Sequence, residues 1–291
     1  MEEFASSATT QRIYAISSVA AAACFVTSAV VLKEPWLVGL YGAYSTGTVY
    51  SMQTMQTLAA YTKERRKPAS ERKNVGDGIS GLSLTVDLGA TLALEYYGLG
   101  IHAWPIVVAQ GLCLFQLVPL SILKATETIK KRDELQADHT IKSNEPKSKL
   151  NKIEKSLSHP LIMSLPVDIG GGAIAASAIF KDPSIAGWLG SVWSLPFIYL
   201  PQLLTTTEQY LSGKTEKIRQ LSLGALAQDT AALATWGVFG AMKGYTPYII
   251  GYSFAALLSL PPLTMVLVED IKAISWDKRR ESEQQNLNQK N

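Results

Sequence analysis

The segment Gln220–Met242, QLSLGALAQDTAALATWGVFGAM, decides the fold of this chain, because it runs without Lys, Arg or His over a length that can cross a lipid bilayer. A transmembrane helix needs about 20 predominantly apolar residues. Seven further segments share these properties. They are Ile13–Leu32, Pro35–Thr62, Asn74–Ile101, Ala103–Leu123, Pro160–Phe180, Pro183–Gly213 and Gly244–Val268. The sequence therefore predicts an all-α, polytopic membrane protein with eight transmembrane helices.

The basic residues indicate which ends of these helices face the cytoplasm. The chain contains 27 Lys and Arg, and with eight crossings all of them except Lys33, Lys181 and Lys243 fall on one side of the membrane. Cytoplasmic loops carry the excess of Lys and Arg, so we expect both termini on the cytoplasmic side of a membrane that the sequence does not identify. The net charge of +3 reflects this topology and indicates no nucleic-acid partner.

The polar stretch Lys124–Ser158 divides the chain into two halves. We expect a first four-helix membrane half at residues 1–124, a charged cytoplasmic linker at 125–157, a second four-helix membrane half at 158–271 and a cytoplasmic tail at 272–291. Four crossings per half give both halves the same orientation. The predicted arrangement is therefore a pair of parallel repeats, related by an axis along the membrane normal.

The two halves also share short stretches of sequence. Ile79–Leu84 reads ISGLSL and Ile218–Leu223, 139 positions later, reads IRQLSL. Further along, an aliphatic residue precedes proline at Val118-Pro119 and at Leu260-Pro261, which are 142 positions apart, as are Pro105 and Pro247. These matches favour an internal repeat that covers the last three helices of each half.

A further pattern follows in the second half, where Leu200-Pro201-Gln202 is followed by the basic turn Lys214–Lys217 and then by Leu221-Ser222-Leu223. This pattern resembles the PQ-loop superfamily, which includes the SWEET sugar transporters, and the resemblance lies mainly in residues 183–268. It implies repeated three-helix bundles that transport a small solute. The corresponding place in the first half reads Met55-Gln56, and the second predicted helix has no interior proline.

Three carboxylates, Asp87, Asp168 and Asp229, lie near the middle of their predicted helices. A charged group is expensive inside the bilayer, so we expect these acids to face the interior of the bundle. No predicted helix contains a basic partner, and burial without one favours a protonated carboxyl group that can carry or donate a proton. The side chains that recur every four residues around the first of these acids are Ser83, Asp87, Thr91 and Glu95. The alternative is a protonated Asp that holds two helices together, and Gly170–Gly172 favours this alternative for Asp168.

The second predicted helix is the most polar, and Tyr44, Thr48, Ser51 and Met55 share one of its faces by helical spacing. Uncharged donors beside aromatic rings are typical of small-molecule sites, so we expect this face to line a cavity. The residues expected to bind substrate are Tyr44, Thr48, Ser51, Gln56, Trp193, Gln202 and Trp236. Three isolated histidines and two cysteines inside predicted helices provide no metal-ligand spacing, and we expect neither a metal nor a cofactor.

Three functions are compatible with this pattern. The first is a small-solute transporter coupled to protons through the mid-membrane aspartates, with Asp87 and Asp229 as proton sites. The second is a membrane-embedded cyclase or isomerase such as a terpene cyclase, in which one protonated Asp acts as general acid on a polyprenyl-type substrate. The third is a membrane scaffold that docks through the Lys124–Ser158 segment. The expected partners are the lipid bilayer, a small-molecule or lipid-soluble substrate and, in a homo-oligomer, further copies of the chain.

Overall fold

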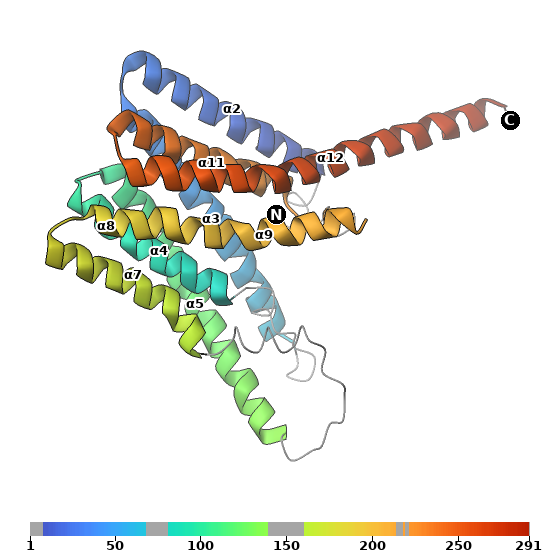
Figure 1. Cartoon of the computed structure of the whole chain (residues 1–291). Helices are drawn as coiled ribbons and strands as arrows, with labels where there is room; N and C mark the ends of the chain where they lie inside the picture. Colours follow the sequence, from blue (N-terminus) through green and yellow to red (C-terminus); the bar gives the residue numbers. More distant parts are fainter. Residues whose placement is uncertain (1–7, 68–80, 139–159, 214–217, 219–220, 291) are drawn as a thin grey trace.

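The computed structural model describes residues 8–67, 81–138, 160–213, 218 and 221–290 (Figure 1). All regular secondary structure within these residues is helical, which confirms the predicted all-α class. The elements follow in the order α2 (Ala8–Leu32), α3 (Pro35–Arg65), α4 (Gly81–Gly100), α5 (Trp104–Asp138), α7 (Pro160–Phe180), α8 (Ser184–Gly187), the π-helix η3 (Trp188–Trp193), α9 (Ser194–Leu211), α11 (Leu223–Lys243) and α12 (Thr246–Lys290).

Three of these helices are long and apolar enough to cross a membrane. Their candidate spans, found within the described residues, are Thr9–Leu32, Trp104–Thr126 and Thr246–Ser275. Large apolar side chains stand outward on the bundle, among them Ile16 and Phe115, which are 70% and 80% exposed. An outer surface of this kind suits lipid better than water. The structure thus supports a membrane protein, and the eight crossings stay a prediction.

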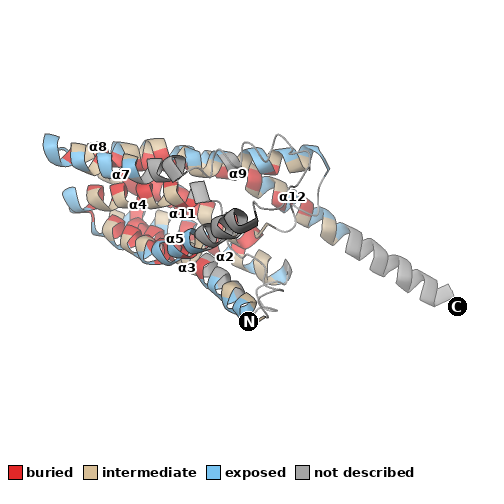
Figure 2. Cartoon of the chain, turned by 90° about the horizontal axis from the view of Figure 1, so that it is seen from below, coloured by how far each residue is buried: buried red, intermediate tan, exposed pale blue. Residues whose placement is uncertain are grey.

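The helices pack around two central elements, α4 and α11. The helix α11 packs against α2, α3 and α12, and α4 packs against α5, α7 and the α8–η3–α9 segment. The bundle is completed by α5, which also contacts α3, and by α12, which also contacts η3 and α9. Buried residues collect on the helix faces that point into the molecule, and exposed residues cover its outside (Figure 2).

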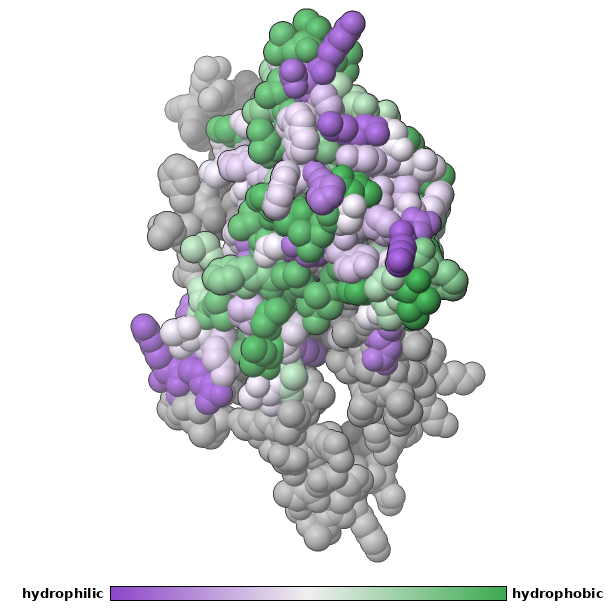
Figure 3. Space-filling model, turned by 90° about the vertical axis from the view of Figure 1, so that its left-hand side faces the viewer, coloured by the Kyte–Doolittle hydropathy of each residue, from purple (hydrophilic) through white to green (hydrophobic). Residues whose placement is uncertain are grey.

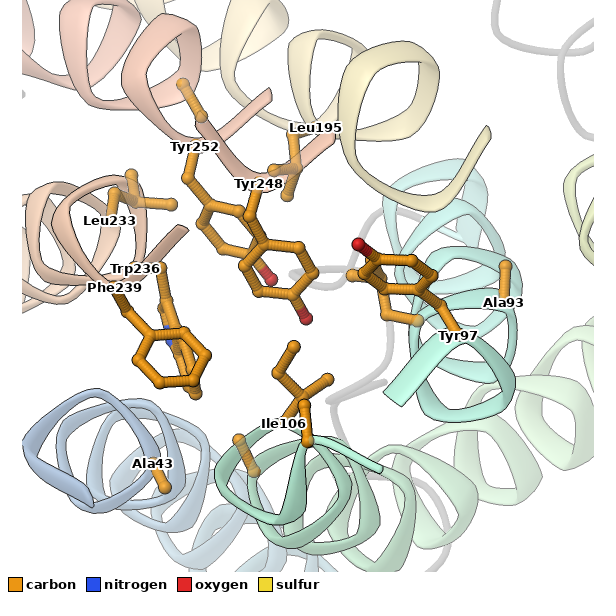
Figure 4. Close-up of a cluster of buried hydrophobic side chains, with 14 of the residues drawn as sticks. Ala43, Ala93, Tyr97, Ile106, Leu195, Leu233, Trp236, Phe239, Tyr248 and Tyr252 are labelled. Atoms are coloured by element: carbon orange, nitrogen blue, oxygen red, sulfur yellow. The ribbon is translucent and has the colours of Figure 1, made fainter. Parts of the chain in front are cut away.

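Aromatic side chains form the centre of the core (Figure 4). Trp236 and Phe239 of α11 meet edge to face with ring centroids 5.6 Å apart. Tyr248 and Tyr252 of α12 stack at 4.6 Å, and Tyr97 of α4 stacks on Tyr248 at 5.8 Å. Rings in these arrangements contribute about 0.5–1.5 kcal/mol per pair beyond the burial of their area. The cluster therefore joins α4, α11 and α12 into one core.

Four short turns lie at one end of the bundle, on the left of Figure 1 and facing the viewer in Figure 3. In each turn a residue one or two positions after the helix adopts positive φ, and the N–H of the residue that follows it donates to the carbonyl five residues earlier. The positive-φ residues are Lys33, His102, Lys181 and Gly244, and the bonds run from Glu34 to Ala29, Ala103 to Gly98, Asp182 to Ser177 and Tyr245 to Gly240 at 2.8–3.0 Å. This geometry is the Schellman motif, which satisfies carbonyls left over at a helix end.

A proline follows each Schellman motif and marks the start of the next helix. Pro35 and Pro183 come two residues after the positive-φ lysine, whereas Pro105 and Pro247 come three residues after the positive-φ residue. Proline is favoured in the first helical turn, because its missing N–H would have no partner there and its φ is already helical. The turns are therefore short and sharply defined.

Two helices extend beyond the predicted boundaries. The helix α5 continues to Asp138, so the first part of the predicted linker at 125–157 is helical. The helix α12 continues to Lys290 through the predicted tail. Near the beginning of this extension Asp270 accepts two hydrogen bonds from Arg12 of α2, at 2.5 and 2.9 Å. The helices α2 and α12 are thus joined by a bidentate ion pair at the end of the bundle opposite the four turns.

The contact between α4 and α7 depends on a glycine. A Cβ atom at Gly170 would lie 2.5 Å from the carbonyl oxygen of Gly89, a backbone atom that cannot rotate away. The two backbones therefore approach as closely as small residues allow. At Gly171 and Gly172 a Cβ atom would meet no atom within 4 Å.

We expect Gly170→Ala to destabilise the protein by about 1–3 kcal/mol, the usual cost of overpacking. Gly171→Ala is the matched control on the same helix, and it should be neutral or slightly stabilising because alanine favours the helix. Thermal unfolding in detergent, followed by circular dichroism, measures both. Equal unfolding temperatures of the two variants would show that α4 and α7 are not in contact at Gly170.

Candidate functional site

A small cavity lies in the interior where α3, α4, α5, α9, α11 and α12 meet. Its lining residues are Thr46, Asp87, Ala90, Thr91, Leu94, Gln110, Cys113, Leu195, Ile198, Tyr199, Asp229, Ala232, Leu233, Trp236 and Tyr252. Its volume is about 50 Å³. One water molecule needs roughly 10–15 Å³ of such space, so the cavity has room for a few waters or one very small ligand.

Two of the predicted acids meet in this cavity. Asp87 enters from α4 and Asp229 from α11. The hydroxyl of Tyr199 on α9 donates a hydrogen bond to Asp229 Oδ1 at 3.1 Å. Two acids from separate helices and a phenol thus share one cavity, which suits the binding and transfer of a proton or of a positively charged group.

Trp236 fixes the cavity wall on the side of α3. Its indole is 1% exposed, and Nε1 donates to Thr46 Oγ1 at 3.0 Å. Close approach of the two helices is possible because α3 has glycine opposite the ring: a Cβ atom at Gly42 would lie 2.8 Å from the indole. Trp236, which was expected to bind substrate, thus lies in the cavity wall, and its contact with substrate stays a prediction.

Gln110 of α5 and Tyr252 of α12 close another side of the cavity. Gln110 Nε2 donates to the hydroxyl of Tyr252 at 3.4 Å, and both residues are buried. A buried amide needs such a partner, because an unsatisfied one costs about 1–3 kcal/mol. Neither residue was expected from the sequence, although their separation of 142 positions equals the offset between Pro105 and Pro247.

A second polar network lies between the cavity and the Arg12–Asp270 pair. Gln228 precedes Asp229 on α11, accepts a short hydrogen bond from the hydroxyl of Tyr14, and donates through Nε2 to the carbonyl of Ser45 at 3.3 Å. These bonds hold α2, α3 and α11 together one residue from the acid. The network therefore orients the α11 face that presents Asp229.

Two predicted acids are not in the cavity. Asp168 is exposed on α7, contrary to the expectation that it faces the interior. Because successive helical residues turn by about 100°, a residue two positions before Gly170, which faces α4, must point away from α4. Glu95 is half-buried and does not line the cavity, and its Oε2 atom is buried without a hydrogen-bond partner in the described part of the chain.

The prediction that the face of α3 with Tyr44, Thr48, Ser51 and Met55 lines a cavity is wrong. Tyr44 and Met55 are 67% and 72% exposed, and the hydroxyl of Thr48 donates to the carbonyl of Tyr44 at 2.8 Å, within its own helix. A threonine satisfied in this way needs no polar cavity. Ser51 accepts a hydrogen bond from Gln116 Nε2 at 2.7 Å and so joins α3 to α5.

The remaining predicted contacts are also outside the cavity or outside the described residues. Trp193 ends the π-helix η3 and packs against Phe197 with ring centroids 5.0 Å apart. The side chains of Gln56 and Gln202 lie outside the described residues. Among the residues that the structure describes, no group of three or more His, Cys, Asp or Glu side chains is arranged to hold a metal ion.

Comparison of the chain with protein-family models, with curated proteins and with solved structures finds no match. The function must therefore be argued from the cavity and from the arrangement of the helices around it.

We expect the Trp236–Thr46 hydrogen bond to contribute about 0.5–1.5 kcal/mol to stability. A double-mutant cycle with Trp236→Phe and Thr46→Val, measured by unfolding in detergent, should give a coupling energy of this size. Thr48→Val is the matched control, because its hydroxyl bonds within α3, and it should show no coupling to Trp236→Phe. Equal coupling energies of Trp236→Phe with Thr46→Val and with Thr48→Val would contradict a specific hydrogen bond between Trp236 and Thr46.

Proposed function

We propose that this chain is a multi-pass membrane transporter of a small solute, coupled to protons through Asp87 and Asp229. The observation that carries the proposal is that one acid from α4 and one from α11 line the same cavity. In the proposed topology α4 and α11 are the third helix of each half. The cavity would then lie between the halves, where transporters with repeats hold their substrates.

The helix contacts support two parallel repeats. Let α2, α3, α4 and α5 correspond to α7, α8–η3–α9, α11 and α12. Under this correspondence the contacts between helices match in pairs. The contact of α4 with α5 matches that of α11 with α12, and the contact of α4 with α7 matches that of α11 with α2. Likewise, α3 with α11 matches α9 with α4, α3 with α5 matches α9 with α12, and α2 with α3 matches α7 with α8. In a bundle without a repeat, the helix contacts of one half would not be expected to match those of the other.

The turns support the same correspondence. Lys33-Glu34-Pro35 and Lys181-Asp182-Pro183 are similar in sequence, and their lysines have φ of 56° and 55°. The matching prolines Pro105 and Pro247 extend this similarity to the other two turns, where proline comes three residues after the positive-φ residue in both cases. These turns favour a proposed repeat that includes the first helix of each half as well as the last three.

Packing contacts between the two proposed halves also support the correspondence between their helices. A Cβ atom at Gly42 would lie 2.8 Å from the ring of Trp236, and one at Gly187 would lie 2.9 Å from the ring of Tyr97. Gly187 follows Gly42 by 145 positions and Trp236 follows Tyr97 by 139. Equivalent residues of the turns are 148 positions apart for Lys33 and Lys181 and 142 apart for Gly98 and Gly240, so both pairs are displaced by three residues, close to one helical turn. Glycine-on-ring contacts about one turn from equivalent positions place α3 against α11 and α8 against α4, and so link the two proposed halves crosswise.

The cavity volume favours transport over catalysis on a large substrate. At about 50 Å³ it is far below the 300–1,000 Å³ of typical small-molecule sites, which are usually largely pre-formed. A polyprenyl substrate therefore does not fit beside Asp229, whereas a transporter closes around its site between openings to the two sides. The aromatic walls at Trp236 and Tyr252 are the one observation that favours the membrane-embedded cyclase as a second candidate.

We expect Asp87→Asn and Asp229→Asn to abolish pH-dependent uptake of the solute in proteoliposomes, because an amide cannot release a proton. Asp168→Asn is the matched control, since Asp168 lies on the outside of α7. Uptake by all three variants at the rate of the unaltered chain would refute proton coupling at the cavity. A lipid-soluble product from polyprenyl substrates without any uptake would favour the cyclase.

The proposed topology makes a separate prediction. In a background with Cys24→Ala and Cys113→Ala, a cysteine at Glu34 should react with a membrane-impermeant maleimide from the non-cytoplasmic side. A cysteine at Ser212 should react only from the cytoplasmic side, because both positions are exposed and lie at opposite ends of the bundle. Labelling of both positions from the same side would refute the alternation on which the parallel repeats depend.

A further inference from the structure

The cavity contains acidic side chains and no basic ones among its described lining residues. Its two carboxyl groups belong to Asp87 and Asp229, and none of the residues described around it is Lys, Arg or His. An anionic ligand would bring a third negative group into a space that offers it no countercharge. A cation, in contrast, finds its countercharge in the cavity wall.

The hydrogen-bonding groups of the cavity favour a ligand that donates. Three of its donors already bond to acceptors of the cavity itself: Trp236 to Thr46, Gln110 to Tyr252, and Tyr199 to Asp229. An ionised carboxylate has about four acceptor positions, and the bond from Tyr199 occupies one of those on Asp229. The site therefore has spare acceptor capacity near Asp229, which N–H groups of a ligand can use.

The remaining wall is aromatic and aliphatic. Trp236 and Tyr252 lie side by side with ring centroids 6.1 Å apart, and Tyr199 stands next to Asp229. Aromatic faces attract cations, by about 2 kcal/mol or more where water is excluded. Leu94, Leu195, Leu233 and their neighbours supply the apolar surface that would contact the hydrocarbon part of a ligand.

From these features we propose that the cavity binds the positively charged nitrogen group of a small organic cation, a guanidinium or primary ammonium head, between Asp229, Asp87 and the rings of Trp236 and Tyr252. The inference rests on the proposed transport function and names its substrate class. Cation and protons then compete for the same carboxyl groups. Binding of the cation releases a proton from the acid to water, and protonation on the other side of the membrane displaces the cation.

Guanidinium and urea provide the decisive probes, because they are planar, almost equal in size and differ in charge. Purified full-length protein is reconstituted into proteoliposomes with an acidic interior, and entry of each radiolabelled probe is compared with entry into empty vesicles. We expect saturable entry of guanidinium and background entry of urea. Tetramethylammonium, which has the charge but no N–H donors, should compete with guanidinium less well than methylammonium does.

Variants then assign the effect to the cavity. Asp87→Asn and Asp229→Asn should each lower guanidinium entry by about tenfold or more, as expected for the loss of a charged hydrogen-bond partner, and Asp168→Asn should not. Circular dichroism and gel filtration in detergent check that each variant folds. The comparison of guanidinium with urea uses the unaltered chain, so it stays decisive if a variant fails to fold.

Two outcomes separate this inference from the function on which it rests. Entry of urea or of an uncharged sugar at a rate equal to or above that of guanidinium would overturn the cationic substrate while leaving the transporter intact. Entry of none of the probes, nor of sugars or neutral amino acids, would overturn both.

Discussion

The contact of a glycine in one helix with an aromatic ring in another is the interaction on which the rest of this bundle depends. Gly42 lies against Trp236, and Gly187 lies against Tyr97. Without a Cβ atom at these positions the helices approach closely enough for the indole of Trp236 to reach Thr46, and for the rings of Tyr97, Tyr248 and Trp236 to join one cluster. In a lipid environment, where the hydrophobic effect does not draw helices together, such close packing provides much of the association energy.

The same contacts determine where the polar chemistry is located. With α3 and α11 packed on Gly42, and α4 packed on the π-helical segment, the acids on α4 and α11 are turned toward a common space. That space is lined by aromatic and aliphatic side chains, and three of its hydrogen-bond donors are engaged with acceptors of the cavity itself. A proton or a cation is the species that such surroundings accommodate best.

The sequence was sufficient to predict helices, their approximate ends and two of the acids in the cavity, because length, apolarity and charge are properties of single segments. It was not sufficient to predict which face of a helix points inward. Tyr44 and Asp168 were both expected inside and both point out, and each is two residues from a glycine that packs against a neighbour, Gly42 and Gly170. Two residues correspond to about 200° around a helix. The positions of the packed glycines would therefore have indicated the inward face of each helix. Polarity gave the wrong face of α3, because Thr48 satisfies its hydroxyl within its own helix. Tyr199 and Gln110 were missed for a related reason, because their partners lie on helices far away in the chain.

The bond between Gln110 and Tyr252 has a consequence for assembly. In the proposed repeat these residues occupy corresponding positions, so an amide in one half donates to a phenol in the other. Two copies of the first half would bring Gln opposite Gln, and two copies of the second half would bring Tyr opposite Tyr. The actual bond can form only when one half of each kind is present. The covalent connection between the two halves keeps their ratio at one to one during synthesis, so every chain contains both partners of this bond.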